Sequence, residues 1–272
     1  MFSLPQSAAS TETVNQTPLR DMPIIPVEED RHALYLLLRT CYPVRAPKLS
    51  ASMSDLRLAL RMARKYDVDV LLGLAEEALV SMLHFHPVSV YALASCYQLD
   101  DLVTRSAIAT RKLHLRDLHS EDLYLIDGKQ CNALVQYHRR CGDAACQITV
   151  DWSWLTTFPS AIFLTGGEWA LLSSCGCHPA DNTYRISTSG GMNYKGTHWW
   201  RRYIDMSKAA LEMRPCGEAV LDEALLSTIL ADARACRTCK VKIDASPDCL
   251  KNFAVAFAAE IERVMEQVPF VL

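Results

Sequence analysis

The residues best suited to chemistry in this 272-residue chain are cysteines in two closely spaced groups. Cys175 and Cys177 are separated by one glycine and followed directly by His178, and Cys236 and Cys239 form a C-x-x-C pair. Zinc binds four thiolate or imidazole ligands in a tetrahedron, and two ligands close together in the chain supply two of its corners. The four cysteines are therefore a candidate structural zinc site, with His178 as an alternative ligand.

Two other uses of these cysteines stay open. Cysteine is often buried as a small hydrophobic residue, and 11 cysteines in one chain give some close pairs by chance. A redox-active pair is the second alternative. Residues 1–21 lack the basic and apolar segments of a signal peptide. We therefore expect an intracellular protein, cytoplasmic or nuclear, whose thiols stay reduced.

The sequence contains no pattern typical of a common enzyme site. It has no H-E-x-x-H, no G-x-S-x-G and no glycine-rich phosphate loop. The net charge of −3 and the pI near 6.2 indicate neither nucleic acid nor an anionic membrane as a partner. No apolar run approaches the roughly 18 residues of a membrane span. We expect a protein that is not an enzyme.

Two stretches alternate aromatic and basic residues, at 137–140 and 198–203. Proteins that bind single-stranded nucleic acid combine these residue types, because bases stack on aromatic rings. The chain carries only two such stretches and a net negative charge. Packing of the rings into a core is therefore the favoured interpretation.

The elements that must position these side chains begin with an internal repeat over residues 55–110. At a constant offset of 31 residues, Ala63 matches Ala94 and Tyr66 matches Tyr97. Each copy predicts a helix that ends at the tyrosine, a short break, and a second helix that starts at an aspartate able to cap it. Because each such unit leaves one face unburied, the two hairpins should stack on each other.

The remaining sequence predicts a mainly α protein. Residues 22–27 are typical of an edge strand or an extended segment. Leu34, Leu37 and Leu38 mark the buried face of the following helix, which should end at Pro43. Ser120 and Asp127 are expected helix caps.

The amino-acid composition of the chain changes near residue 150. All five tryptophans lie between 152 and 200, in a glycine-rich stretch that should be irregular or contain a hairpin. The last helix should begin at Ser246-Pro247. Its apolar residues follow helical spacing: Leu250, Phe253, Ala254, Phe257, Ala258, Ile261, Val264 and Met265. We divide the chain into a flexible tail (1–21), a first domain (22–117) and a C-terminal helical domain (118–272).

Several segments of the chain resemble BTB/POZ domains, especially the form found in mushroom-type fungi. They read MFSLPQ, MPIIPV, EEDRHALYLLLRTCYP and ARKYDVDVLLGLAEEALVSML. The second repeat, HPVSVYALASCYQLDDL, is similar to the helical extension that follows many such domains. The fungal relatives also carry the patterns found here at Tyr137–Cys141, Trp199–Tyr203, Arg214–Cys216, and Cys236 with Cys239.

The resemblance implies a partial BTB/POZ-like helical core with at most a residual short strand, and a function in protein–protein interaction. The chain begins after the two strands and helical hairpin that open the family's fold and supply much of its homodimer interface. It therefore implies a monomer, or an exposed apolar patch beside residues 22–38. The alternatives are an enzyme or nucleic-acid binder with a site in residues 150–203, and a decayed paralogue without a partner.

Overall fold

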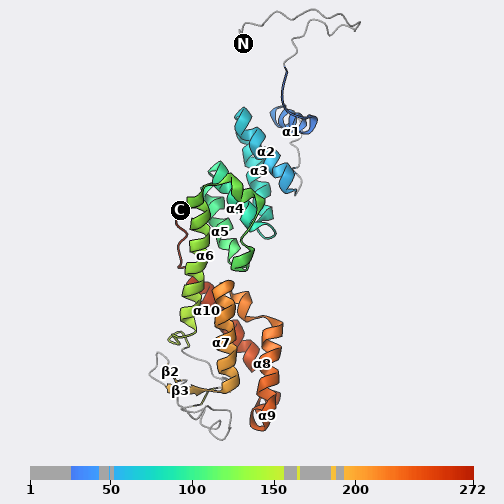
Figure 1. Cartoon of the computed structure of the whole chain (residues 1–272). Coiled ribbons are helices and arrows are strands. Elements are labelled where there is room, and N and C mark those ends of the chain that lie inside the picture. Colours follow the sequence, from blue (N-terminus) through green and yellow to red (C-terminus); the bar gives the residue numbers. More distant parts are fainter. Residues whose placement is uncertain (1–25, 43–48, 50–51, 156–163, 166–184, 188–192) are drawn as a thin grey trace, which may run out of the picture. The chain divides into compact units, whose positions relative to one another are not determined.

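The structure is a computed structural model that describes residues 26–42, 49, 52–155, 164–165, 185–187 and 193–272. The chain divides into two compact units, residues 1–47 and residues 48–272. The boundary predicted between residues 117 and 118 falls inside the second unit. The expected tail, 1–21, lies outside the described residues. The fold is mainly α, as the sequence predicts (Figure 1).

The described part of the first unit is the helix α1 (Arg31–Cys41). The Asp30 carboxylate caps it by accepting a hydrogen bond from the Ala33 N–H at 2.8 Å. The buried residues are Ala33 and Leu36, whereas Leu38 is 50% exposed, so the predicted buried face was wrong. Apolar residues follow one another without a gap from 33 to 38, and such a run does not single out one helical face. Pro26 and Val27 belong to no strand, and the rest of 22–27 lies outside the described residues.

The second unit opens with the two predicted helical hairpins, which pack against each other (Figure 1). Their helices are α2 (Met53–Tyr66), α3 (Asp69–Met82), α4 (Pro87–Tyr97) and α5 (Asp100–Thr110).

The two breaks inside the hairpins have the same geometry. Asp67 and Gln98 adopt left-handed backbone conformations with φ of 54° and 62°. In each copy the N–H two residues after the tyrosine donates to the carbonyl of the matched alanine, Ala63 or Ala94, at 2.9 Å. The repeat is thus confirmed, with Tyr66 and Tyr97 as the last residues of α2 and α4.

The start of the second helix in each hairpin differs from the prediction. Val68 and Leu99 occupy the N-cap positions, without a side-chain capping bond. The aspartates expected to cap are the first helical residues, Asp69 and Asp100. A carboxylate in the first turn still interacts favourably with the helix dipole, which explains why the residue type suits either position.

A connection of two short 3-10 helices leads from the hairpins into α6. These are η1 (Leu115–Asp117) and η2 (Glu121–Leu125), and α6 is Gly128–Ile148. Both predicted caps are confirmed. The Ser120 hydroxyl accepts from the Asp122 N–H, and Asp127 and Gln130 form a reciprocal capping box at the start of α6.

The described residues between α6 and α7 include a small antiparallel sheet in the order β1-β3-β2. Its strands are β1 (Leu164–Thr165), β2 (Arg185–Ser187) and β3 (Asn193–Gly196). The antiparallel β2–β3 pair agrees with the expected hairpin-containing stretch.

The helices that follow are α7 (His198–Met213), the 3-10 helix η4 (Gly217–Val220), α8 (Glu223–Ala235), α9 (Arg237–Ala245) and α10 (Cys249–Met265). The last helix starts two residues later than predicted, at Cys249, because Ser246 ends α9 by donating its N–H to the carbonyls of Lys242 and Ile243. Its predicted apolar face is buried except for Val264, which is half-buried.

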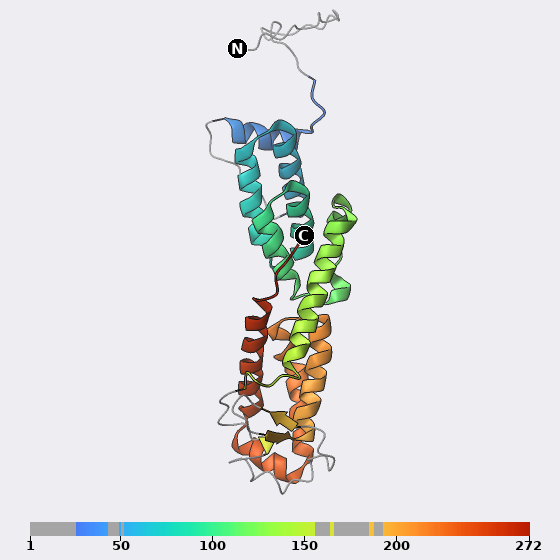
Figure 2. The ribbon, with the colours of Figure 1, turned by 90° about the vertical axis from the view of Figure 1, so that its left-hand side faces the viewer.

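The helix α6 connects the hairpins to the C-terminal helices within the second unit. It contacts α5 near one end, and α7 and α10 near the other (Figure 1). The C-terminal residues run back toward the hairpins (Figure 2). There the Phe270 ring meets Tyr91 and Tyr137 edge-on, with centroids 5.9 and 5.4 Å apart, and Arg140 donates to the Pro269 carbonyl at 3.1 Å.

Candidate functional site

The predicted zinc ligands fall in two regions, and the structure describes only one of them. Cys175, Cys177 and His178 lie outside the described residues. Cys236 sits at the break between α8 and α9, in an extended conformation with φ −88° and ψ 124°, and Cys239 is buried in the first turn of α9. This extended residue separates the segment into two helices, so the two cysteines do not share one helix.

Among the described residues, no group of three or more His, Cys, Asp or Glu side chains could hold a metal ion. The zinc site on residues 175–178 and 236–239 therefore stays a prediction.

Two cysteines of α6, Cys141 and Cys146, are core residues. Cys141 is fully buried and Cys146 nearly so. Burial raises the pKa of the Cys141 thiol, and it raises the pKa of Cys146 to about 11. Since a thiolate is the reactive form of cysteine, both side chains stay protonated and unreactive at neutral pH.

The two aromatic and basic stretches use their rings for packing. Trp200, Tyr203 and Tyr137 are fully buried. Trp200 packs against Trp152 and edge-on against Phe253, with centroids 5.1 and 5.8 Å apart. The expected packing role is confirmed for these residues.

The arginines of the second stretch also have intramolecular partners. Arg201 pairs with Asp205 at 3.7 Å, and Arg202 pairs with Asp232 on α8. Both stretches thus stabilise the helical core.

His138 is a fully buried polar residue of α6. Its Nε2 lies 3.1 Å from the carbonyl oxygen of Leu113, just after α5. Burial lowers the pKa of this imidazole, and the hydrogen bond to the Leu113 carbonyl only partly opposes the effect. A neutral histidine thus ties α6 to the end of the second hairpin.

A partly buried ion pair that sequence reasoning missed joins the first hairpin to η2. Arg57 of α2 donates to both carboxylate oxygens of Asp122, with Nε–Oδ1 at 2.5 Å and Nη2–Oδ2 at 2.8 Å. Asp122 is only 3% exposed, whereas Arg57 is 40% exposed. The Ser89 hydroxyl on α4 lies 2.7 Å from that of Ser120, so the second hairpin is held at the same place.

The charge of Asp122 is set by two opposing effects. Burial raises the pKa of the carboxyl, but hydrogen bonds from Arg57, Ser89 and Ser120 outweigh burial and lower it below the usual value. Asp122 is therefore ionised at neutral pH. The 65 residues between the two partners explain why no local pattern reveals the pair.

Exposed apolar side chains lie in the loop before α4 and in η2. Phe85, in the loop before α4, is 71% exposed. In η2, Tyr124 is 94% exposed and Leu125 is 51% exposed. The contact between Ser89 and Ser120 brings this loop and η2 to one end of the hairpin pair. We call Phe85, Tyr124 and Leu125 the loop–η2 surface.

The comparisons with known proteins add no relative. Protein-family models, curated proteins and solved structures give no match to this chain. The resemblance to BTB/POZ domains therefore stays a prediction. Among the described helices, none is both long and apolar enough to cross a membrane.

Proposed function

We propose that this chain is a non-enzymatic, intracellular protein–protein interaction module of the BTB/POZ type. The observation that carries the proposal is the loop–η2 surface. Tyr124 is 94% exposed and Phe85 is 71% exposed, and exposed aromatic side chains of this kind lower solubility without adding to the core. Aromatic side chains supply much of the binding energy in protein interfaces.

The contacts that hold the loop–η2 surface in place are consistent with a role in protein binding. Repeated helical hairpins commonly present binding surfaces, because each unit buries one face against its neighbour and leaves another free. The Arg57–Asp122 pair and the Ser89–Ser120 contact hold η2 against both hairpins. A surface held in this way loses little conformational entropy when a partner binds.

The proposal is tested by affinity purification from the source cells followed by mass spectrometry. The bait is compared with a Phe85→Ser/Tyr124→Ser variant and with Val241→Ser. Val241, on α9, is 67% exposed and lies outside the surface, so it is a matched control. The expected result is a discrete protein retained by the wild type and the control, lost with the double variant, and bound again when both proteins are purified.

The same set of captured proteins with all three baits, or none that binds once purified, would contradict the proposal. Binding that survives the double variant but depends on another part of the chain would show that the surface was wrongly chosen. Circular dichroism of the three baits checks that each one is folded.

A further inference from the structure

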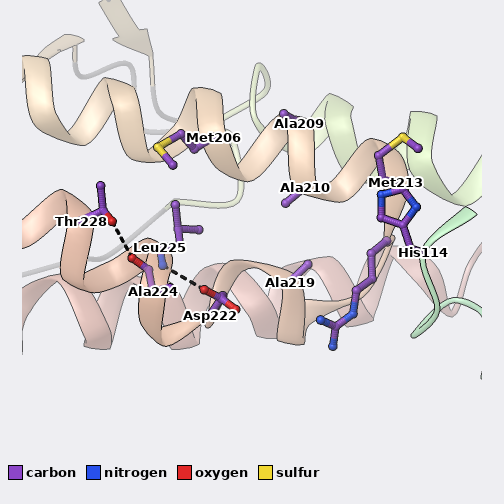
Figure 3. Close-up of a pocket in the computed structure, with 11 residues that line it drawn as sticks. His114, Met206, Ala209, Ala210, Met213, Ala219, Asp222, Ala224, Leu225 and Thr228 are labelled. Carbon is purple, nitrogen blue, oxygen red and sulfur yellow. Dashed lines mark hydrogen bonds between the residues drawn. The ribbon is translucent and has the colours of Figure 1, made fainter. Parts of the chain in front are cut away.

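An apolar groove of about 470 Å³ lies between α7, η4 and the start of α8 (Figure 3). Its upper wall in the figure is a single face of α7, formed by Met206, Ala209, Ala210 and Met213. These residues follow the i, i+3, i+4, i+7 spacing of one helical stripe. The volume lies within the range of small-molecule sites, roughly 300–1,000 Å³.

The groove stays open because the residues on its two sides are small. Ala219 of η4 lies opposite Ala210 of α7 across the gap, and Ala224 of α8 lines the groove further along (Figure 3). Methyl groups cannot fill the space between two helices that larger side chains would close. The flexible thioethers of Met206 and Met213 can adjust to the shape of an apolar guest.

Arg214 is the arginine that lines the groove, and it belongs to a group of ion pairs in which Glu262 also pairs with Arg111 at 3.6 Å. Arg214 donates from Nη2 to Glu218 Oε2 at 3.0 Å, and Lys112 Nζ lies 2.5 Å from Glu218 Oε1. One carboxylate thus serves two cations. The Nε–H of Arg214 is buried and has no hydrogen-bond acceptor within the part of the chain that the structure describes.

Asp222 is the acidic group that lines the groove, and its charge has a local use. Its Oδ1 accepts a hydrogen bond from the Leu225 N–H at the start of α8, at 2.9 Å. The positive end of the helix dipole favours a carboxylate there. Among the described contacts, Arg214 pairs with Glu218 and not with Asp222.

We propose that this groove binds a medium-chain aliphatic monocarboxylate. The alkyl chain lies between α7 and α8, and the carboxylate accepts the buried Nε–H of Arg214. At about 1.5 Å per helical residue, the stripe from Met206 to Met213 spans roughly 10 Å, which suits such a chain. This proposal is independent of the interaction function above.

The test uses decanoate as the probe and 1-decanol as its uncharged counterpart. Titration of ¹³C-methyl-methionine protein follows the Met206 and Met213 signals, which are assigned with the Met→Leu variants. Two pairs of variants accompany the wild type. Ala224→Leu fills the groove, and Ala231→Leu places the same side chain on an exposed position of α8 outside it. Arg214→Gln removes the cation, and Arg234→Gln removes an exposed arginine elsewhere on α8.

The expected result is saturable decanoate binding that shifts both methionine signals. Ala224→Leu and Arg214→Gln should each weaken it about tenfold or more, the scale of a lost charged hydrogen bond or a filled site. Ala231→Leu and Arg234→Gln should leave it unchanged, and 1-decanol should bind at least about tenfold more weakly. No saturable binding, equal binding of the alcohol, or full binding by a folded Ala224→Leu variant would each overturn the proposal.

Discussion

Removal of Arg57 should cost more stability than neutralisation of its partner Asp122. Arg57→Met leaves a carboxylate that is 3% exposed without its guanidinium. Loss of one partner of a fully buried ion pair costs about 3–5 kcal/mol of folding stability. Because the Arg57 position is 40% exposed, water can reach the unpaired carboxylate, and we expect a smaller loss of about 2–3 kcal/mol. Asp122→Asn leaves a guanidinium that water can solvate, so about 1–2 kcal/mol is expected.

The assay is urea unfolding of the two single variants and the double variant at pH 7, followed by circular dichroism. The single effects should not add, because either substitution already breaks the bidentate contact. The matched control is Arg105→Met. Arg105 pairs with Asp101 at 3.3 Å on the surface of α5, and its loss should cost less than about 1 kcal/mol. For a unit of this size each kcal/mol shifts the melting temperature by about 2–4 °C.

The pH dependence gives a second measurement with a definite sign. Because the pKa of Asp122 is lowered in the folded protein, its contribution is present above the unfolded pKa, near 3.9, and is lost as the pH falls through the folded pKa. Without Arg57, burial dominates and the pKa of Asp122 rises above its unfolded value. The difference between wild type and Arg57→Met should therefore shrink as the pH falls from 7 to 4. A cost for Arg57→Met below that of Asp122→Asn, additive effects, or a difference independent of pH would refute this reasoning.

Three further predictions concern the core and the cysteines. Leu60→Ala should cost about 2–5 kcal/mol because Leu60 is fully buried, and Leu74→Ala should cost less because Leu74 proves only half-buried; thermal unfolding of both variants compares them. Gly73→Ala should stabilise α3 by up to about 1 kcal/mol, because the added methyl group meets open space. Gly142→Ala should not show this gain, because its methyl group would lie 3.0 Å from a backbone carbonyl oxygen of α7. Equal effects of the two substitutions in urea unfolding would contradict this prediction. If the zinc hypothesis holds, purified protein should contain about one zinc per chain, lost on Cys239→Ser; metal content decides, because a hydroxyl in the buried Cys239 position lowers stability in either case.

The expected apolar patch on the first unit can be compared with the structure. Val27, Tyr35, Leu38 and Tyr42 are each about half exposed or more. Three of them, Tyr35, Leu38 and Tyr42, follow the i, i+3, i+7 spacing of one face of α1 and its end. Native mass spectrometry can distinguish a monomer from an oligomer that forms through this face of α1.

Local signals in the sequence determined the helical character, the repeat and several helix ends. Tyr66 and Tyr97 mark equivalent breaks because the hydrogen bonds that end a helix join residues within one turn of each other. The same locality explains why Asp127 could be recognised as the cap of α6, where Gln130 completes a capping box. In α1, apolar residues occupy every position from 33 to 38, so they show no helical period. The buried face predicted for this helix was therefore wrong.

Only the tertiary structure decided which distant residues meet. The Arg57–Asp122 pair joins positions 65 residues apart, and the groove beside Arg214 depends on how α8 packs against α7. Gly217 shows the same limit. A Cβ on this residue would lie 2.8 Å from the carbonyl oxygen of Ala258, a close approach that nothing in the sequence around either residue reveals. Propensities and caps act over a few residues, whereas burial, ion pairing and cavities arise when segments far apart in the chain are packed together.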